Sequence, residues 1–530
     1  MSDSVILANR ISDWAAKQPD LDILTFVSID ADGSFVEEHR SYQQLWNNGQ
    51  RLAAWLRDRG MRKGDAFGIL MENHPEFVDL MVASSILGTI FVPIDPRSKG
   101  DKLKYMLDFA GCKGVVAADY ALARVNEVWA GRDENWILSL TARQGNSVHS
   151  ILDGPLPSPQ LAVASTDPEE PMQMLYTSGT TGDPKAILSA HSRFAAVPVI
   201  GQVLGLTEND RPYTGLSLTH ANAQIVTLGS ILIMGLPGVI SRRFTKSRLW
   251  DIARHYRCTW FNLLGGMTTA IFADPPKEND RDNPVRIILS AGMPGAIWDS
   301  FEKRFDLKLA EFYGAAEGGL TFNPAGAGPV GSCGKAPPFL ELKIFDNDDN
   351  ECSPGEAGEI CFRNADGSVP EVAYFKNPEA SAEKTRGGWL RMGDIGHVDE
   401  DGWLYFDYRK GGGVRRNGDF INTATVEKVL SQIESIDDVF VYGVPFPGMA
   451  PGEKELVAAI VIAEAASFDQ QEIFRVCREK LESNYVPSFL QVVEAIPKTA
   501  SEKPQERFLL EAFDTAAGNI FSAASLEETG

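Results

Sequence analysis

Apolar residues along this chain recur at helical spacing in segments that run directly into short, β-rich stretches. The clearest example is residues 46–75, where a helical apolar stripe ends near Gly60, the expected C-cap, and the buried stretch AFGILM follows at 66–71. The same order recurs in three further segments, residues 77–94, 100–117 and 248–262. This alternation predicts an α/β fold with layered, mostly parallel sheets and helices.

Two stretches interrupt the alternation and indicate how the chain divides into domains. Residues 154–171 hold five prolines and are expected to form an exposed linker. Residues 409–419, RKGGGVRRNGD, place three glycines in a row before a new helical pattern. We therefore expect a large N-terminal domain over residues 1–409 and a small, mobile α+β lid over residues 410–530. The tail itself predicts helix, strand, strand and helix at 425–433, 439–443, 456–463 and 469–483.

The composition narrows the classes of partner. A formal net charge of -22 argues against nucleic acids and anionic membranes, because both require a basic surface. The most apolar run, Leu80–Ile94, is too short to span a bilayer, so membrane insertion is not expected. Six cysteines without a CxxC pair, seven histidines without metal-ligand spacing and the lack of a secretory signal favour a cytoplasmic protein. The oligomeric state stays open, a homodimer included.

Residues 176–185, YTSGTTGDPK, combine hydroxyl side chains, two glycines and a closing lysine. Glycine lets the backbone approach closely, exposed N–H groups form an anion-binding nest, and Lys185 adds a positive charge. The stretch therefore predicts a phosphate-binding loop for a nucleoside triphosphate. It is not a P-loop, in which the lysine follows the second glycine directly. The alternative is a polar linker.

This stretch resembles the phosphate loop of the acyl- and aryl-CoA synthetase superfamily of adenylate-forming enzymes, whose pattern is S/T-SGTTGxPK. Three further segments resemble motifs of that superfamily in the same order, EFYGAAEGG (311–319), GWLRMGDIGHVDEDGWLYF (388–406) and IPKTASEK (496–503). The resemblance covers nearly the whole chain. It implies a small-molecule carboxylate as substrate, with ATP, Mg²⁺ and CoA.

The resemblance also implies which residues bind ATP. In the phosphate loop these are Thr177, Ser178, Gly179, Thr180, Thr181 and Lys185, and Thr177 is also implied in catalysis. Elsewhere they are Gly292, Met293 and Pro294 along the adenine edge, Glu311, Phe312, Tyr313 and Gly314 in the adenine motif, and Asp394 and Arg409 at the ribose. Glu317 is the implied magnesium ligand, since its carboxylate is a hard oxygen donor. Without the resemblance, Tyr313 would be core and Glu317 and Arg409 would be solvated charges.

Two half-reactions are implied in turn. Lys503 matches the lysine that family members bring to the carboxylate and the α-phosphate during adenylation, where a mobile cation offsets the repulsion between two anions. The small domain is then implied to swing about a hinge at Lys410, Gly411 and Gly412, so that Asn417 and Gly418 face the pantetheine of CoA. On its own, Lys503 would be a solvated side chain.

Three positions depart from the superfamily pattern. Ala316 stands where the motif has threonine, Gly412 stands at the pivot that is usually Asp or Lys, and Phe420 stands where asparagine is usual. The alanine removes one hydroxyl contact to phosphate, a loss of roughly 0.5–1.5 kcal/mol. Because these changes gather where the second half-reaction is organised, transfer to CoA is less secure than adenylation.

The acyl pocket is expected between the ATP motifs. SLTHANAQ (217–224), FNLLGGM (261–267) and PPKENDRDNPVR (275–286) resemble the carnitine and crotonobetaine–CoA ligase branch. This implies that His220 is a gate beside the carboxylate and takes part in catalysis, with Asn222 and Gln224 on the wall and Gly265 and Gly266 leaving room for the acyl chain. The alternative for His220 is a structural histidine. A quaternary ammonium would need an aromatic face from Trp260 or Phe261, and strand alternation sends only one of them inward.

The leading hypothesis is therefore an ATP-dependent acid–thiol ligase that converts a small or medium carboxylate to its acyl-CoA through an acyl-adenylate, with release of AMP and pyrophosphate. One alternative keeps adenylation but passes the acyl group to a carrier protein or an amine. Another is a degenerate, non-catalytic nucleotide-binding protein. The presence of Lys185, Glu317, Asp394, Arg409 and Lys503 together argues against the last of these.

Overall fold

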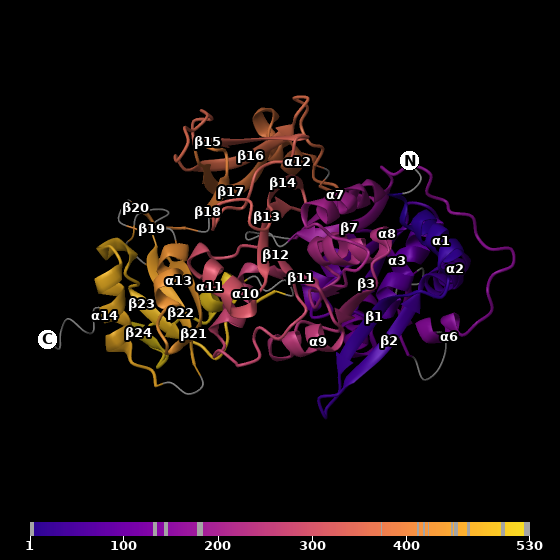
Figure 1. Cartoon of the computed structure of the whole chain (residues 1–530), viewed down its shortest axis with the longest axis horizontal. Coiled ribbons are helices and arrows are strands. Elements are labelled where there is room, and N and C mark those ends of the chain that lie inside the picture. The colour runs from indigo at the N-terminus through magenta and orange to yellow at the C-terminus, as the bar shows by residue number, and fades with distance from the viewer. Residues whose placement is uncertain are drawn as a thin grey trace.

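The computed structural model describes most of the 530 residues. The described ranges are 5–130, 135–141, 147–177, 184–372, 374–410, 413–416, 419–421, 423–446, 449, 454–463, 467–499 and 504–523. In Figure 1 an α/β region carries the N-terminus, a smaller sheet lies above it, and a C-terminal region lies at the far left.

A mixed sheet of eight strands, counted in the described ranges, crosses the α/β region. Its strand order is β14 (Gly318–Asn323), β13 (Lys308–Ala315), β12 (Ile287–Ala291), β11 (Trp260–Leu264), β9 (Pro212–Thr214), β10 (Gly238–Ser241), β1 (Asp22–Ile29) and β2 (Phe35–Ser41). The inner pairs are parallel, and the pairs at the two edges, β13–β14 and β1–β2, are antiparallel. This confirms the predicted α/β class.

A second sheet has six strands among the described residues. Its order is β6 (Trp136–Ser139), β5 (Cys112–Ala117), β3 (Ala66–Leu70), β4 (Ile90–Pro93), β7 (Pro171–Thr177) and β8 (Lys185–Ala190). Every pair is parallel except the hairpin β7–β8. The predicted strand at 66–71 is confirmed as β3.

Three helices and the sheet faces that they cover form the largest hydrophobic core. These are α1 (Leu7–Lys17), α2 (Tyr42–Asp58) and α3 (Pro75–Leu87), which pack in one cluster with residues of both sheets. The side chains of β3 alternate between two cores. Phe67 and Ile69 belong to this cluster, whereas Ala66 and Leu70 belong to a second cluster that includes residues of α4 (Gly100–Phe109). Burial on both faces explains why these strands are almost wholly apolar.

Helix α2 has clear local causes. The side chain of its N-cap, Ser41, accepts a hydrogen bond from the backbone N–H of Gln44. The Gln44 side chain in turn accepts a hydrogen bond from the backbone N–H of Ser41. At the other end the C-cap is Arg59 and not the predicted Gly60. Gly60, with φ of 83°, is the residue directly after the C-cap. Gly49 allows the close approach to α3, because a Cβ there would lie 2.6 Å from Val82.

The other helices of the α/β region are short. They are α5 (Leu122–Trp129), α6 (Val148–Leu152), α7 (Val197–Val203), α8 (Gly229–Met234), α9 (Leu249–His255), α10 (Gly265–Ala273) and α11 (Gly295–Phe305). The predicted helix–strand pairs at 77–94, 100–117 and 248–262 are confirmed as α3–β4, α4–β5 and α9–β11. Among the described residues, no helix combines the length and apolarity that crossing a membrane requires.

An antiparallel sheet between residues 340 and 409 was not predicted. It contains β15 (Leu340–Phe345), β16 (Gly358–Asn364), β17 (Leu390–Val398) and β18 (Leu404–Arg409), with helix α12 (Pro378–Lys384) between the second and third strands. Its residues Ile360, Phe362 and Leu390 form a buried cluster together with Ile187 of β8. The sheet carries Asp394 and Arg409, so it supplies one side of the candidate site.

The C-terminal region has its own cores. It contains α13 (Thr423–Leu430), β21 (Ile436–Val444), β22 (Glu455–Ile462), α14 (Gln470–Lys480), β23 (Phe489–Val492), α15 (Glu506–Glu511) and β24 (Ile520–Ser522), preceded by the hairpin β19 (Val414–Arg416) and β20 (Asp419–Ile421). Two apolar clusters in this region draw only on residues beyond 413. The four elements predicted for the tail are present with shifted ends, whereas β19, β20, β23, β24 and α15 were missed. The boundary at 409/410 and the mobility of the lid stay predictions.

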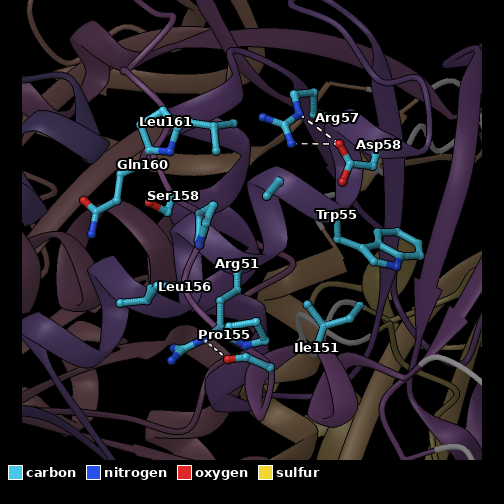
Figure 2. A pocket seen from close by; sticks show the side chains of 14 residues that line it. Arg51, Trp55, Arg57, Asp58, Ile151, Pro155, Leu156, Ser158, Gln160 and Leu161 are labelled. Carbon is cyan, nitrogen blue, oxygen red and sulfur yellow. Dashed lines mark hydrogen bonds and ion pairs between the residues drawn. The ribbon is translucent and has the colours of Figure 1, made fainter.

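The proline-rich segment 154–171 runs along the surface, as its composition predicted. Its first part and α2 line a pocket of about 540 Å³ (Figure 2). There Arg51 donates to the carbonyl of Gly154 at 2.8 Å, while Arg57 and Asp58 form an ion pair at 2.8 Å. Since both arginines have partners and none of the predicted site residues lines this pocket, it is separate from the candidate active site.

Candidate active site

The predicted phosphate loop lies between the two strands of the hairpin β7–β8 in the sequence. Thr177 ends β7 and is paired with Lys185, the first residue of β8. Ser178, Gly179, Thr180 and Thr181 lie outside the described residues. The Lys185 ammonium lies 5.2 Å from the ring centroid of Tyr374, which comes from the segment before α12. The register of the hairpin therefore brings both ends of the loop together beside an aromatic ring.

Glu317 lies in the tight connection between β13 and β14 and is half-buried. Its Oε1 accepts a hydrogen bond of 2.7 Å from the Tyr374 hydroxyl. Two positive-φ glycines, Gly318 and Gly319, follow it and let the chain reverse at once. The guanidinium of Arg193 donates to the carbonyl of Ala316, the residue before Glu317. Burial lowers the pKa of Arg193, and the Glu317 carboxylate opposes that shift.

The surroundings of Glu317 fit a magnesium ion. Within the described part of the chain, Oε2 of Glu317 has no hydrogen-bond or ion-pair partner, while Oε1 is held by Tyr374. Mg²⁺ is commonly bound by one or two carboxylates together with substrate phosphates and water. A single oriented carboxylate near a predicted phosphate loop meets that requirement without further protein ligands. No group of three or more metal-ligating side chains is found among the described residues.

Tyr313, Asp394 and Arg409 come together across two sheets. The Tyr313 hydroxyl donates to Oδ2 of Asp394 at 2.6 Å, and Nε of Arg409 lies 3.7 Å from Oδ1. Asp394 and Arg409 are directly paired between β17 and β18. Burial and the neighbouring Asp394 carboxylate raise the pKa of Tyr313, so its hydroxyl stays a donor. The arrangement leaves one largely buried carboxylate facing an aromatic ring and an exposed cation, which suits a ribose with its adenine.

Glu311, predicted among the ATP contacts, is only 2 % exposed. Its carboxylate accepts hydrogen bonds from the backbone N–H groups of Gly292 and Met293. Burial raises its pKa to about 7. Glu311 therefore holds the predicted adenine loop from inside the protein, and Pro294 is the N-cap of α11.

The neighbours of Tyr313 in β13 face different surroundings. Phe312 packs beside the apolar cluster around Trp260, with its ring 6.4 Å from that of Phe322. Gly314 is exposed, and a Cβ there would lie 2.8 Å from the carbonyl oxygen of Gly319. Glycine at this position therefore permits the tight β13–β14 connection that carries Glu317.

The predicted hinge begins at an ion pair. Lys410 lies 3.0 Å from the Glu359 carboxylate, which also pairs with Arg391 at 3.1 Å. The backbone N–H of Lys410 donates to the carbonyl of Gly393 at 2.9 Å. Thus Lys410 is fastened to β17, the strand of Asp394. The predicted hinge glycines, the predicted CoA contacts and the predicted catalytic lysine lie outside the described residues, namely Gly411, Gly412, Asn417, Gly418 and Lys503.

Three residues of this site were missed by sequence reasoning. These are Arg193, Tyr374 and Lys384. Lys384 is the last residue of α12, and its Nζ donates to the carbonyl of Met392 at 3.0 Å. Burial lowers the pKa of Lys384, and the carboxylates of Glu317 and Asp394 oppose that shift. Lysine at the end of a surface helix is ordinary in a sequence. The only feature of the sequence that points to Tyr374 is that it is an aromatic residue between two of the motifs.

The predicted acyl-pocket residues lie around a π-helix, η4 (Asn222–Leu228). The His220 carbonyl accepts from the backbone N–H of Gln224 at 3.2 Å. Gln224 is fully buried and its side-chain amide donates to the Leu218 carbonyl at 2.6 Å, so it fixes the turn that carries His220. Asn222 accepts from Asn262 of β11, which in turn accepts from Thr227 at 2.7 Å. This polar chain lies within an otherwise apolar region, and π-helical turns are frequent at functional sites.

Strand β11 separates the two candidate aromatic residues. Trp260 and Phe261 are both fully buried, and they belong to different apolar clusters. This confirms the alternation that the sequence predicted. Gly265 and Gly266 follow the strand as the first residues of α10, and a Cβ on Gly266 would meet nothing within 4 Å. Gly266 is exposed, and its place beside an acyl chain stays a prediction.

Taken together, an oriented carboxylate, a carboxylate–tyrosine pair and a lysine at a hairpin end surround one region. The family model of the AMP-binding enzyme matches residues 11–368, which is well over half of the chain. The chain belongs to the AMP-binding enzyme family. A second family model, the AMP-binding enzyme C-terminal domain, matches residues 425–503 and falls within the C-terminal region. The adenylate-forming superfamily predicted from the motifs is thereby confirmed.

Relatives of this AMP-binding enzyme include ligases of different names. The medium/long-chain-fatty-acid–CoA ligase FadD17 of Mycobacterium marinum is 27% identical over 482 residues, covering 90% of this chain and 92% of the relative. The crotonobetaine/carnitine–CoA ligase of Escherichia coli is 26% identical over 492 residues, covering 90% and 94%. Its relatives thus include the branch that the acyl-pocket segments resemble and fatty-acid ligases as well.

Solved structures share the fold of this AMP-binding enzyme. The anthranilate CoA ligase AuaEII, solved in complex with anthranoyl-AMP, superimposes with a TM-score of 0.82 at 22% identity, covering 96% of this chain and 97% of that one. At this identity the likeness concerns the fold. It confirms the predicted architecture of a large α/β region followed by a smaller C-terminal region.

Proposed function

We propose that this AMP-binding enzyme is an ATP-dependent acid–thiol ligase. It converts a small or medium carboxylate to its acyl-CoA through an acyl-adenylate and releases pyrophosphate and AMP. The observation that carries the proposal is the meeting of Glu317, the Tyr313–Asp394 pair and Lys185 in one region of a chain from this family. Each of these groups suits a different part of Mg²⁺–ATP.

The nucleotide would be held by residues from three elements. The Asp394 carboxylate would accept the ribose hydroxyls, because the Tyr313 hydroxyl already orients it from the other side. The Tyr313 ring and the Gly292–Met293 loop would face adenine, with Glu311 fixing that loop from within. Lys185 would contact the phosphates at the mouth of the β7–β8 hairpin.

In the first half-reaction a carboxylate oxygen attacks the α-phosphorus and the bond to the pyrophosphate oxygen breaks. The difficulty is electrostatic, since two anions must meet. Bound Mg²⁺, for which Glu317 is the candidate ligand, would neutralise phosphate charge. Lys185 and Arg409 would add fixed positive charge, and Lys503 would bring a further cation during this step only.

In the second half-reaction the CoA thiolate attacks the acyl carbon, and the carbon–oxygen bond to AMP breaks. Adenylation is needed because a bare carboxylate repels nucleophiles and has no good leaving group. We infer that the C-terminal region turns about Lys410, Gly411 and Gly412 between the steps, so that Asn417 and Gly418 replace Lys503 at the site.

The acid would enter beside His220 and extend toward Gly266, where the chain leaves space. The names of the relatives cover medium/long-chain fatty acids and betaines, so we infer that the acid is aliphatic. We also infer a cytoplasmic location without nucleic-acid partners, because the six cysteines, all of them described, are free of disulfides and the net charge is -22.

The test is pyrophosphate release from Mg²⁺–ATP across short fatty acids, betaines and aryl acids, each with and without CoA. We expect one aliphatic acid to give a signal that CoA accelerates, together with the mass of its thioester. Pyrophosphate release that CoA does not accelerate would favour an adenylating enzyme with a carrier protein or an amine as acceptor, a possibility raised by Gly411 and Gly412. ATP binding without pyrophosphate release for any acid would contradict catalysis altogether.

A further inference from the structure

Tyr374 touches two of the groups on which the proposed chemistry depends. Its hydroxyl donates to Oε1 of Glu317 at 2.7 Å, and its ring lies under the Lys185 ammonium at 5.2 Å. Glu317 and Lys185 belong to different sheets and are 132 positions apart by their numbers. One side chain therefore joins the candidate metal ligand to the end of the phosphate loop.

The position of Tyr374 is fixed by its backbone. Its N–H donates to the Ser381 hydroxyl at 3.0 Å, and Phe375 donates to the carbonyl of Ala186 at 2.8 Å. An isolated bridge also pairs Tyr374 with Ile187 of β8. The backbone of Tyr374 is thus held beside β8, the strand that begins with Lys185. Only 8 % of the surface of Tyr374 is exposed.

The hydroxyl of Tyr374 is a dedicated donor. It lies 2.7 Å from a carboxylate oxygen of Glu317, which accepts the hydrogen bond, so the phenol O–H is the donor. A hydrogen bond from a hydroxyl to an ionised carboxylate is about twice as strong as a hydrogen bond between two neutral groups. Oε1 is held in this way, and no described residue bonds to Oε2.

The ring of Tyr374 acts on the lysine separately. A cation over an aromatic face is attracted by the electrons of the ring, and the attraction grows as the cation is desolvated. This contact holds the ammonium near the hairpin end. The hydroxyl and the ring thus serve two different groups, and substitutions can separate them.

We propose that Tyr374 is a positioning residue that orients Glu317 for Mg²⁺ through its hydroxyl and Lys185 for phosphate through its ring. The inference rests on the proposed function for the identity of the ligand, Mg²⁺–ATP. It concerns nucleotide binding alone, before any acid or thiol takes part.

Calorimetric titration with ATP, in EDTA and across a series of Mg²⁺ concentrations, tests the division of roles. We expect Tyr374→Phe to raise the Mg²⁺ concentration for half-maximal tightening about 3- to 10-fold, while metal-free ATP affinity stays unchanged. Tyr374→Leu should also weaken metal-free ATP binding several-fold, because the ring contact to Lys185 is lost. The matched control is Tyr405→Phe in β18, whose hydroxyl lies 3.5 Å from Asp399 and away from the site. It should behave as wild type.

A purely structural role for Tyr374 would lower the melting temperature and weaken both kinds of binding equally, which would overturn the inference. Wild-type Mg²⁺ dependence in Tyr374→Phe would overturn it as well. If Tyr374→Phe does not fold, Glu317→Asp shortens the other partner by one methylene and should produce the same selective shift. Failure of the wild-type protein to form a thioester would leave these titrations intact, whereas lack of ATP binding would refute both proposals.

Discussion

Asp394 carries two contacts that define what its carboxylate can still do. Oδ2 is taken by the Tyr313 hydroxyl at 2.6 Å, and Arg409 stands 3.7 Å from Oδ1. A carboxylate fixed at one oxygen and flanked by an exposed cation is well placed to accept hydrogen bonds from a diol. Discrimination between ribose and deoxyribose should therefore depend on this residue.

We predict that wild-type protein binds ATP about 10-fold more tightly than 2′-deoxy-ATP, since a hydrogen bond to a charged group is worth about 1.5–3 kcal/mol. Asp394→Asn should weaken ATP binding by about 10-fold and remove most of that discrimination. Calorimetry with the two nucleotides measures both effects. Asp401→Asn, in the exposed turn after β17, is the matched control. Equal discrimination in Asp394→Asn and wild type would rule out the ribose role.

Glu311 illustrates how burial alone creates a pH effect. Its pKa is raised from the usual value of 4.5 to about 7, so the folded state disfavours its ionised form. The contribution of this residue to stability is therefore highest below about pH 4.5 and declines until about pH 7. Its hydrogen bonds from Gly292 and Met293 oppose that decline without cancelling it.

We predict that Glu311→Gln flattens the dependence of the melting temperature on pH between about 4.5 and 7.5, because the amide keeps an acceptor for the loop but does not ionise. Thermal unfolding of both proteins across this range is the measurement. The variant should gain stability relative to wild type as the pH rises. Two parallel curves would mean that Glu311 does not titrate in this window.

Among the elements, the hairpin β7–β8 and the short helix α6 are placed by different forces. The hairpin closes by backbone pairing, which brings Thr177 and Lys185 together whatever the loop contains. Helix α6 packs on α2 and also makes a side-chain contact with α3, where His149 lies 3.2 Å from the buried Glu76. Arg40 of β2 shares the same oxygen of Glu76 at 3.0 Å. This contact of α6 therefore depends on charge.

The hydrogen bond to Glu76 raises the pKa of His149, against the effect of burial. Because the folded pKa exceeds the unfolded one, the stabilisation is complete below about pH 6.5 and disappears as the pH rises through the folded value. We predict that His149→Gln costs less than about 1 kcal/mol at pH 5.5, since the side chain is 46% exposed. The cost should vanish at pH 8.5. Urea unfolding at the two pH values measures it, and an equal cost at both would contradict the role of charge.

At the scale of the whole molecule, the C-terminal region has apolar clusters of its own beyond residue 413. A region with its own core can turn as a body about a short connection, which is what the two half-reactions require. Lys410 is fastened to Glu359 and Gly393 at the start of that connection. In the proposed turn, Lys410 would therefore stay with β17.

We predict that Lys503→Ala lowers the rate of adenylation by orders of magnitude while ATP affinity changes little, because this cation would act only as the carboxylate and α-phosphate meet. Acid-dependent exchange of pyrophosphate into ATP measures the rate, and calorimetry measures binding. Lys480→Ala, an exposed lysine of α14 in the same region, is the control. Unchanged exchange in Lys503→Ala would refute its assigned role.

Much of the fold follows from local pattern. Helix α2, strand β3 and the tail elements were predictable because capping residues and apolar periodicity act over a few positions. The antiparallel sheet β15–β18 was not, since its strands pair in a register that no local period encodes. The polar turns between its strands also resemble linkers.

The sequence by itself determined the family and the phosphate-loop stretch, because these are patterns of residue type and spacing. Through the family resemblance it also predicted Glu317, Asp394 and Lys185 as site residues. Only the tertiary structure decided that Tyr374 joins Glu317 to Lys185, that Arg193 reaches Ala316 and that Glu311 faces inward. Such contacts link residues far apart in the chain. They arise from sheet register and burial, which depend on the packing of the whole molecule.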